Sequence, residues 1–226
     1  MNGGALVRCD GAGRTFLTGG RATVALEPVW CAVSPAARIA LVGSSGSGKS
    51  TLLHLMAGLD LPSVGEVTWP AIGDRSVLRP GPLAMIFQGP SLLPPLTVEE
   101  NVALPLTLGG RTSTEARRLA VSALDRLGLG DLAEKLPEEI SGGQAQRVAV
   151  ARGLAGEPRL ILADEPTGQL DRSNGSAVVD VLLAAADRSG AALVVATHDP
   201  DVADRLPERW EMRDGRLTTA SGRVRC

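Results

Sequence analysis

Two hydrophobic patterns alternate along the chain. Short apolar runs bounded by glycine or charged residues occur at 38–42 (RIALV), 159–163 (RLILA) and 191–197 (AALVVAT). Runs this short, with no polar side of their own, are typical of strands buried on both faces of a parallel sheet. Four further β-like runs, ALVRCD, RATVALE, GEVTW and LAMIF, lie in the first 90 residues. The pattern therefore predicts an α/β core with an antiparallel β subdomain near the N-terminus.

A helical pattern replaces the strands from about residue 90. TVEENVALPL and TSTEARRLAVSALDRLGL predict helices, and Thr112 and Glu115 have the spacing of a capping box. In the second helix, apolar positions recur at helical intervals at Ala116, Leu119, Ala120, Ala123, Leu124 and Leu127. Strand and helix patterns alternate again from Arg159. We therefore expect a helical subdomain over 90–157, inserted into an α/β core made of 1–89 and 158–226.

Glycine and proline mark the expected turns. ERWEMRDGRLTT, residues 208–219, predicts a hairpin that turns at Asp214-Gly215. Between Ser63 and Gln88 the prolines at 70, 80 and 82 predict a short loop in place of further strand. Gly153 falls inside a predicted helix, where glycine costs about 1 kcal/mol relative to alanine. Close packing is the expected reason for it.

Composition narrows the class of protein. The formal net charge of −2 gives no electrostatic footprint for nucleic acid. No apolar run approaches the roughly 18 residues that a membrane helix needs, and MNGGALVRCD has no signal-peptide core, so we expect a soluble cytoplasmic protein. Cys9, Cys31 and Cys226 lack the spacing of metal ligands or of a disulfide framework, so we expect ordinary core or surface thiols.

Lysine is rare in this chain and one lysine stands in a distinctive setting. It occurs only at 49 and 135, whereas 21 of the 23 basic residues are arginine. Lys49 lies in GSSGSGKST, between a predicted strand and a predicted helix. Glycines in that context let backbone N–H groups converge on phosphate oxygens at the helix N-terminus, which is the arrangement of a P-loop. The alternative is a flexible glycine loop with a surface lysine.

The P-loop predicts a role for each of its polar side chains. Lys49 is expected to reach the β- and γ-phosphates, Ser50 to ligate Mg²⁺, and Thr51 to add a phosphate contact. The residues expected to line the nucleotide are Gly43, Ser44, Ser45, Gly46, Ser47, Gly48, Lys49, Ser50 and Thr51.

Two carboxylates follow the apolar run that begins at Arg159. Asp164 and Glu165 come at the C-terminal end of a predicted parallel strand, where ligands of open α/β sheets bind. Asp164 is expected to hold Mg²⁺, and Glu165 to polarise the attacking water as general base. His198, at the end of the last such run, is expected to touch the γ-phosphate or orient the water. Capping or packing roles are the alternatives for all three residues.

The motifs GSSGSGKST, FQ, ISGGQ, ILADEP, QLD and THD occur in this order. Together they resemble the nucleotide-binding subunit of an ABC transporter over nearly the whole chain. The resemblance implies a P-loop NTPase core of the RecA-like type and an ATPase that uses ATP and Mg²⁺. It also implies that Gln88 contacts the Mg²⁺ site, that Phe16 stacks on adenine, and that Asp171 communicates between protomers.

ISGGQ is the most diagnostic of these motifs. Ser141, Gly142, Gly143 and Gln144 open a predicted helix whose first N–H groups and positive dipole end suit a phosphate. The resemblance implies that this helix meets the P-loop of a second protomer across a head-to-tail dimer, with ATP between them. An N-cap without a ligand is the alternative for these four residues.

The resemblance also implies partners. LLPPLTVEENVALPL, LADEPTG and THDP are similar to the ATPases that serve lipoprotein-release, macrolide-export and cell-division permeases. An integral membrane permease, docked beside Gln88, is therefore expected to hold the chain at the cytoplasmic face of the membrane, as a homodimer or with a related ATPase. No nucleic-acid partner is expected.

Three other functions remain as alternatives. The ATPase could serve a mechanical regulatory complex that moves no solute. The second alternative is a P-loop kinase that acts on small metabolites, although the ISGGQ helix would have no function in such a kinase. The third is a non-catalytic ATP-sensing module, which Glu165 and His198 disfavour.

Overall fold

A computed structural model describes residues 4–168 and 170–219, except for the side chains of Thr18, Arg172, Ser173 and Thr219. The chain forms two compact units. The first contains residues up to Leu78 and from Ala192 onward, and the second runs from Arg79 to Ala191. Among the described residues, no helix is both long and apolar enough to cross a membrane.

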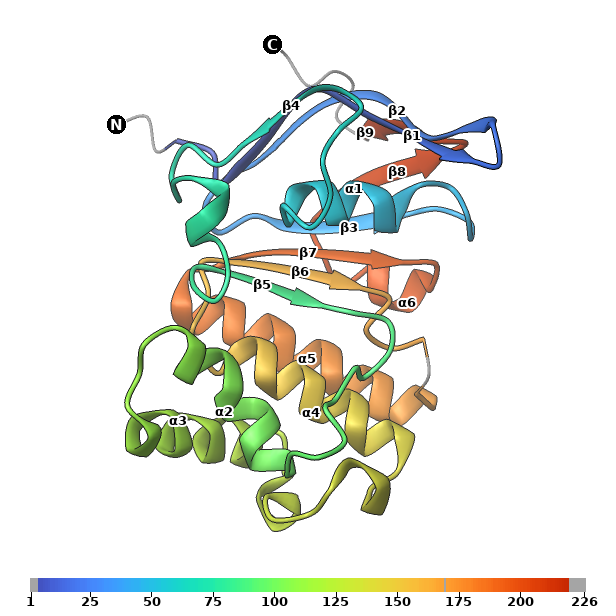
Figure 1. Ribbon diagram of the computed structural model, residues 1–226. Helices are drawn as coiled ribbons and strands as arrows, with labels where there is room; N and C mark the ends of the chain where they lie inside the picture. Colours follow the sequence, from blue (N-terminus) through green and yellow to red (C-terminus); the bar gives the residue numbers. More distant parts are fainter. Residues whose placement is uncertain (1–3, 169, 220–226) are drawn as a thin grey trace. The chain divides into compact units, whose positions relative to one another are not determined.

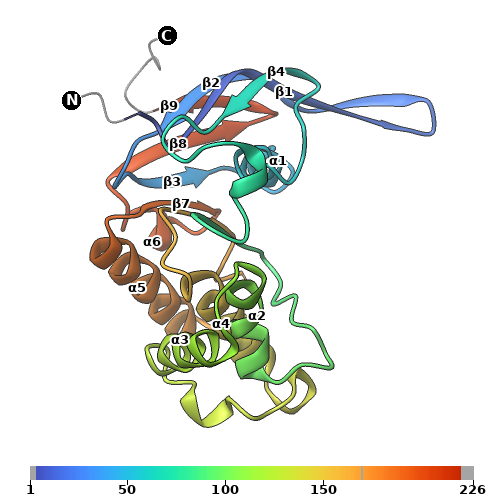
Figure 2. The ribbon, with the colours of Figure 1, turned by 60° about the vertical axis from the view of Figure 1, so that its left-hand side comes forward.

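An antiparallel sheet forms one layer of the first unit. β1 (Val7–Thr18) lies between β2 (Arg21–Val33) and β4 (Val64–Thr68). The predicted strands are confirmed here, but both are longer than their sequence runs. β1 continues past ALVRCD to the tip of a twisted β1–β2 hairpin (Figure 2), and β2 continues past RATVALE, away from that tip, to Val33. Side chains near the hairpin tip are exposed whether they are polar or apolar, with Leu17 at 79% and Val24 at 54%, so this part of β1 has no buried face to mark it in the sequence.

A second sheet of this unit carries the loops that bear chemistry. β3 (Arg38–Val42) pairs in parallel with β7 (Ala192–Thr197) on one side and with β8 (Glu208–Arg213) on the other. β8 turns into the antiparallel β9 (Arg216–Thr219), as the hairpin prediction required. All of β7 and the centre of β3 are buried, which explains their continuous apolar character.

Helix α1 (Lys49–Met56) lies between β3 and the antiparallel sheet (Figure 1). Its C-terminal end is fixed by two side chains from the connection that follows. Trp69 donates from its indole N–H to the carbonyl of Met56 at 2.8 Å, and Arg75 donates to the carbonyl of Gly58 at 2.7 Å. Arg75 begins a short 3₁₀ turn, Arg75–Val77, in the proline-rich stretch that was predicted to be a loop. A four-residue helix, α6 (Pro200–Ala203), follows β7.

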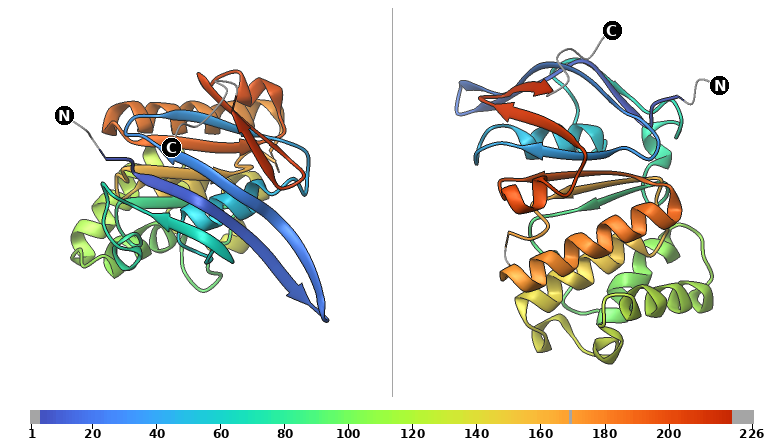
Figure 3. Two further views of the ribbon diagram at one scale, coloured as in Figure 1. Left: turned by 90° about the horizontal axis from the view of Figure 1, so that it is seen from above. Right: turned by 180° about the vertical axis from the view of Figure 1, so that it is seen from behind.

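The second unit places helices against two parallel strands. β5 (Leu83–Ile86) pairs with β6 (Leu160–Asp164). Helices α2 (Val98–Leu108), α3 (Ser113–Asp125), α4 (Gly142–Leu154) and α5 (Arg172–Ser189) complete it, with 3₁₀ turns at Gly130–Leu132 and Pro137–Glu139. α4 and α5 run side by side (Figure 3). The helices predicted from periodicity lie at α2, α3 and α4.

Helix caps show how the sequence sets these boundaries. Thr97 and Glu100 form a reciprocal capping box at the start of α2. Only half of the box predicted for α3 is present, because Thr112 accepts from the N–H of Glu115 while the Glu115 carboxylate pairs with Arg111 instead. Both devices satisfy N–H groups that a helix end leaves without an intrahelical partner.

Candidate nucleotide site

The P-loop joins β3 to α1 in the first unit. Gly46 and Gly48 have φ values of 76° and 103°, a backbone region that favours glycine. A side chain at Gly48 would also place its Cβ 2.7 Å from the carbonyl oxygen of Ala25, and one at Gly43 would clash with the carbonyl of Met212. Gly46 instead faces open space. Two of the glycines are thus required by close packing, and the third leaves the loop open.

The hairpin turn between β8 and β9 is hydrogen-bonded to the P-loop. The N–H of Gly215 donates to the carbonyl oxygen of Ser47 at 3.0 Å, and the carbonyl of Gly215 accepts from the N–H of Glu27 at 2.9 Å. Asp214 and Gly215 have φ values of 49° and 75°, as a type I′ turn requires. This turn was predicted from the sequence, but its contact with the P-loop was not.

The N-terminus of α1 has the properties of an anion receptor. Its N-cap is Gly48, which offers no side-chain acceptor to the first N–H groups of the helix. Lys49 is 5% exposed, and its ammonium donates to the carbonyls of Gly43 at 2.8 Å and Ser44 at 3.1 Å. Uncapped N–H groups, a positive dipole end and a buried ammonium together suit a phosphate chain. Ser50 is exposed and Thr51 half-buried in the first turn of α1.

His198 and the start of the P-loop line one cavity of about 930 Å³ in the first unit. His198 follows β7 directly and is exposed, and Gly43 and Ser44 form another part of the wall. Parallel pairing of β3 with β7 explains the arrangement, since it brings the carboxyl ends of both strands to the same edge.

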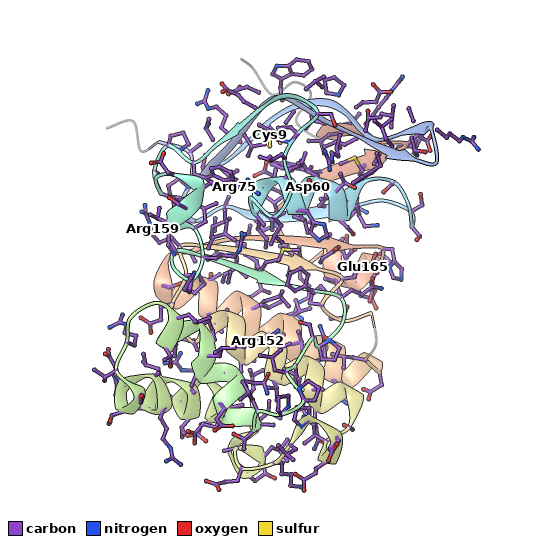
Figure 4. All side chains as sticks on the ribbon, in the orientation of Figure 1. Cys9, Asp60, Arg75, Arg152, Arg159 and Glu165 are labelled. Atoms are coloured by element: carbon purple, nitrogen blue, oxygen red, sulfur yellow. The ribbon has the colours of Figure 1, made fainter. Side chains whose placement is uncertain are left out.

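Phe16 lies on the β1–β2 hairpin, opposite Thr23, and does not line that cavity. Its side chain is 41% exposed. The guanidinium carbon of Arg14 lies 4.7 Å from the centre of the phenyl ring, and Arg14 is itself held by Asp60 at 2.8 Å. Asp60 is labelled in Figure 4. The ring is therefore positioned by a cation–π contact and still offers a substantial area to a ligand.

In the second unit, β6 delivers the predicted carboxylates. All five residues of β6 are buried, and Asp164 is its last residue. Glu165 follows with a φ of 44°, an unusual conformation for a residue other than glycine that turns the chain sharply out of the strand. Figure 4 labels Glu165 at this end of β6.

Gln88 lies close to Glu165. A methyl group placed on Gly168 would lie 3.6 Å from the side-chain nitrogen of Gln88 and 3.6 Å from a carboxylate oxygen of Glu165. The backbone N–H of Gly168 also donates to the carbonyl of Glu165 at 3.1 Å. The structure thus brings these two predicted site residues together around one glycine.

The ISGGQ motif forms the entrance of α4, as predicted, but that entrance is not bare. Ser141 accepts from the N–H of Gln144 at 3.2 Å, and the Gln144 side chain accepts from the N–H of Ser141 at 2.8 Å. This reciprocal capping box satisfies the N–H of Gln144 within the chain itself. Gly142 is exposed and faces open space, so the surface of the helix entrance remains accessible.

Asp171 caps the start of α5. One carboxylate oxygen accepts from the backbone N–H of Asn174 at 2.9 Å and the other from its side-chain amide at 2.6 Å. The adjacent Leu170 lies against the ISGGQ motif, because a methyl group on Gly143 would be 3.3 Å from it. Asp171 therefore has a structural role within its own chain, and its predicted role between protomers stays a prediction.

Two residues of α4 that the sequence analysis did not select contact the segment around Gln88. The Gln146 amide donates to the carbonyl of Phe87 at 3.0 Å, and Arg152 donates to the carbonyl of Ser91 at 3.0 Å. Burial lowers the pKa of the Arg152 guanidinium. Gln146 did carry a signal in the sequence. It lies three and four residues before Ala149 and Val150, on an apolar helix face where a polar side chain needs a partner.

A phosphate-binding loop at an uncapped helix, with carboxylates at the end of a buried parallel strand, defines a P-loop nucleotide hydrolase. Residues 26–168, more than half of the chain, match the family model described as ABC transporter. The chain belongs to this family and is an ATP-binding, ATP-hydrolysing subunit of an ABC transporter.

Solved structures resemble the chain over almost its full length. The ATP-binding cassette MJ0796, in a dimeric post-hydrolysis state bound to ADP and Pi, has 34% identity and a TM-score of 0.86, covering 96% of this chain and 100% of that one. Another dimeric structure of MJ0796, described as a bacterial ABC transporter cassette, gives a TM-score of 0.87 at 34% identity over the same shares. CbiO1 from Clostridium perfringens, part of the ABC transporter complex cbiONQ, has 26% identity and a TM-score of 0.80, covering 95% of this chain and 87% of that one.

Proposed function

We propose that two copies of this chain close head to tail around two MgATP molecules and that hydrolysis reopens them to drive a membrane permease. The observation that carries the proposal is that the chain exposes two different helix N-termini that could each face a phosphate. The N-terminus of α1, at Lys49, has no side-chain cap because its N-cap residue is Gly48. The N-terminus of α4 is exposed at Ser141 and Gly142. The dimeric state of MJ0796 with ADP and Pi supports the dimer in this proposal.

The energetic requirement is modest. Charge-assisted hydrogen bonds contribute roughly 1.5–3 kcal/mol each. Shifting a two-state equilibrium from mostly open to mostly closed needs about 5.5 kcal/mol. Two sites with two or three bonds each to a γ-phosphate exceed that requirement, and hydrolysis removes these bonds. The γ-phosphate thus acts as a reversible link between protomers.

The donor set fits a magnesium ion held together with phosphate. The buried Asp164 carboxylate, the Ser50 hydroxyl and the Gln88 amide oxygen would hold the ion, because they are hard oxygen ligands of the kind that Mg²⁺ prefers. Bound Mg²⁺ would neutralise charge on the transferring phosphoryl group. Glu165 then serves as the base for the attacking water, His198 contacts the γ-phosphate, and Phe16 stacks on adenine.

The surface around Gln88 suits a protein partner. Phe87 and Leu93, on either side of it in sequence, are 36% and 43% exposed. Large apolar side chains left in water beside a catalytic segment are typical of a docking surface. We assign this surface to a permease. The strings LLPPLTVEENVALPL, LADEPTG and THDP of this chain are similar to ATPases that serve lipoprotein-release, macrolide-export and cell-division permeases, and this similarity supports a partner of that subgroup. A permease partner would hold the chain at the cytoplasmic face of the membrane.

A Glu165→Gln variant tests the proposal. Loss of the base should lower ATP turnover at least ~100-fold, and the variant should persist as a dimer in MgATP during analytical ultracentrifugation. Glu157→Gln is the matched control, because Glu157 is also a glutamate with positive φ, at 50°, but is exposed elsewhere in the second unit.

Cross-linking tests the head-to-tail geometry. With Ser45→Cys and Ser141→Cys in one Cys226→Ser chain, oxidation should join two chains only when ATP is bound. The control pair is Ser45→Cys with Gly110→Cys. Gly110 is exposed in the turn between α2 and α3, outside the ISGGQ motif, so this pair should form no ATP-dependent cross-link. A monomeric Glu165→Gln variant at saturating MgATP, with no ATP-dependent cross-link, contradicts the proposed dimer.

A further inference from the structure

The segment that carries Gln88 is bound to α4 on both sides of that residue. Before Gln88, the Gln146 side-chain amide donates to the carbonyl of Phe87 at 3.0 Å. After it, Arg152 donates to the carbonyls of Pro90 at 3.3 Å and Ser91 at 3.0 Å. Arg152 also donates to the Ser91 hydroxyl at 2.9 Å. Figure 4 labels Arg152 on α4.

The contact through Gln146 is built into the core of the second unit. Gln146 is completely buried, and its amide nitrogen also donates to the carbonyl of Pro166 at 3.3 Å, next to Glu165. A buried amide is retained in a core only where its hydrogen bonds offset the cost of removing it from water. Its side chain therefore connects α4 to the segments of both Gln88 and Glu165.

Gly153 brings the helix close enough for this contact. It lies seven residues after Gln146, which is nearly two turns, so both residues are on the same face of α4. A methyl group on Gly153 would lie 3.0 Å from the Ile86 side chain. Glycine thus lets α4 lie directly on β5, and this explains the glycine that the sequence placed inside a helix.

The contact through Arg152 holds a strained turn. Ser91 has a φ of 43°, which is unfavourable for serine and persists only where surrounding contacts fix it. The guanidinium supplies three hydrogen bonds to residues 90 and 91, and its planar fork cannot be reproduced by lysine. Gln88 itself remains exposed between the two fixed points.

We propose that Gln146 and Arg152 are positioning residues that hold Gln88 in its working place and transmit movements of the ISGGQ helix to it. When a phosphate engages the entrance of α4, the same rigid helix moves or restrains the carbonyls on either side of Gln88. The inference rests on the proposed function for the role of Gln88, while the mechanical contact is a property of the second unit alone.

The mechanical part can be tested without nucleotide. A nitroxide attached at Gly89→Cys lies beside Gln88, where the structure leaves open space for a label. The label is attached in a Cys226→Ser chain, so that Cys226 cannot compete for it. Cys9 and Cys31 can stay, because they are buried and react slowly. We expect Gln146→Met and Arg152→Met each to narrow the electron paramagnetic resonance lines, and the double variant to narrow them further. Unchanged lines in the double variant overturn the inference.

Kinetics test the positioning role. Misplacing a catalytic group by an ångström costs up to about 100-fold, so each variant should lower kcat at least ~10-fold. The dissociation constant for ATP should stay within about threefold, because the P-loop supplies most phosphate contacts. Arg152→Lys should restore only part of kcat. An unaltered kcat in a chain whose label has become mobile overturns the positioning role.

Two controls separate this inference from its premises. Arg118→Met removes an exposed arginine from α3, away from residues 87–91, and should change neither the line shape nor kcat. Circular dichroism should show that each variant retains its helices. If Glu165→Gln keeps full turnover, the proposed function fails, whereas the line shapes still report on the contact between α4 and the Gln88 segment.

Discussion

The N–H of Gly215 and the carbonyl oxygen of Ser47 are joined by a 3.0 Å hydrogen bond, so the turn between β8 and β9 supports the phosphate loop. Residues far apart in the chain thereby share one structural task. The turn has its own conformational requirement, since Gly215 has a φ of 75°. The phosphate loop therefore depends on a residue that contacts no phosphate in our proposal.

Gly215→Val should weaken both the fold and nucleotide binding. Valine in the left-handed region costs of order 1–3 kcal/mol, and part of that strain should displace Ser47. Urea unfolding and ATP titration measure the two effects. Gly110→Val is the matched control, because Gly110 has a φ of 86° in a turn of the second unit with open space around it. If both variants bind ATP equally well, the turn does not support the loop.

Lys49→Ala should abolish tight ATP binding. The variant loses the ammonium that reaches the phosphates, and charge-assisted bonds of about 1.5–3 kcal/mol each correspond to roughly a 10- to 150-fold loss for every bond removed. Isothermal titration measures the dissociation constant. Lys135→Ala removes the chain's other lysine, which is exposed, and should bind ATP like the unaltered protein. Equal affinity of the two variants would remove Lys49 from the site.

Phe16→Leu should weaken binding of ATP but not of inorganic tripolyphosphate. Aromatic stacking on a base contributes about 1–3 kcal/mol, so the expected loss for ATP is at least ~5-fold. Tripolyphosphate has no base to stack and should bind both proteins alike. Leu17→Ala, at a neighbouring position that is 79% exposed, controls for changes to the hairpin. If Phe16→Leu lost the same affinity for ATP and for tripolyphosphate, the substitution would have damaged phosphate binding, and the loss could not be assigned to adenine stacking.

Cys31 should make the protein less stable at alkaline pH. A hydrogen bond with Cys9, its partner across β1 and β2, and then burial raise the pKa of Cys31 well above its usual value. The unfolded chain releases this proton near pH 8.5. The stabilisation is complete below that pH and is lost as the pH rises toward the folded pKa, because the unfolded state then binds fewer protons.

Urea unfolding at several pH values from about 7.5 to 10 measures this loss. In a Cys226→Ser background, Cys31→Ala should lower stability at neutral pH but flatten the alkaline decline. The same decline in both proteins would exclude the Cys31 thiol as its cause.

The sequence alone predicted the strands because local patterns encode them. Strands β3, β6 and β7 lie at the runs RIALV, RLILA and AALVVAT, and the turn lies at Asp214-Gly215. These features can be predicted because strand burial and turn conformation depend on residues that are neighbours in the sequence. Cys9 and Cys31 are free and buried, as expected, and Cys226 lies outside the described residues.

The supporting contacts could not be predicted in this way. Gln146 and Phe87 are separated by 59 positions, and Arg152 and Ser91 by 61, so only the folded topology brings them together. The capping box at Ser141 and Gln144 was also missed as such. Gly142 and Gly143 suggest N–H groups without side-chain partners, whereas the two capping side chains lie on either side of them in the sequence.

The support of the phosphate loop by the β8–β9 turn has a consequence for biosynthesis. A ribosome completes Gly43–Thr51 long before it reaches Gly215, so the nascent loop emerges without the residue that steadies it. If nucleotide binding needs this support, as the Gly215→Val variant tests, a nascent chain binds ATP tightly only after the last hairpin has been translated. A prematurely terminated chain that lacks the hairpin would then contain the P-loop motif but bind nucleotide weakly.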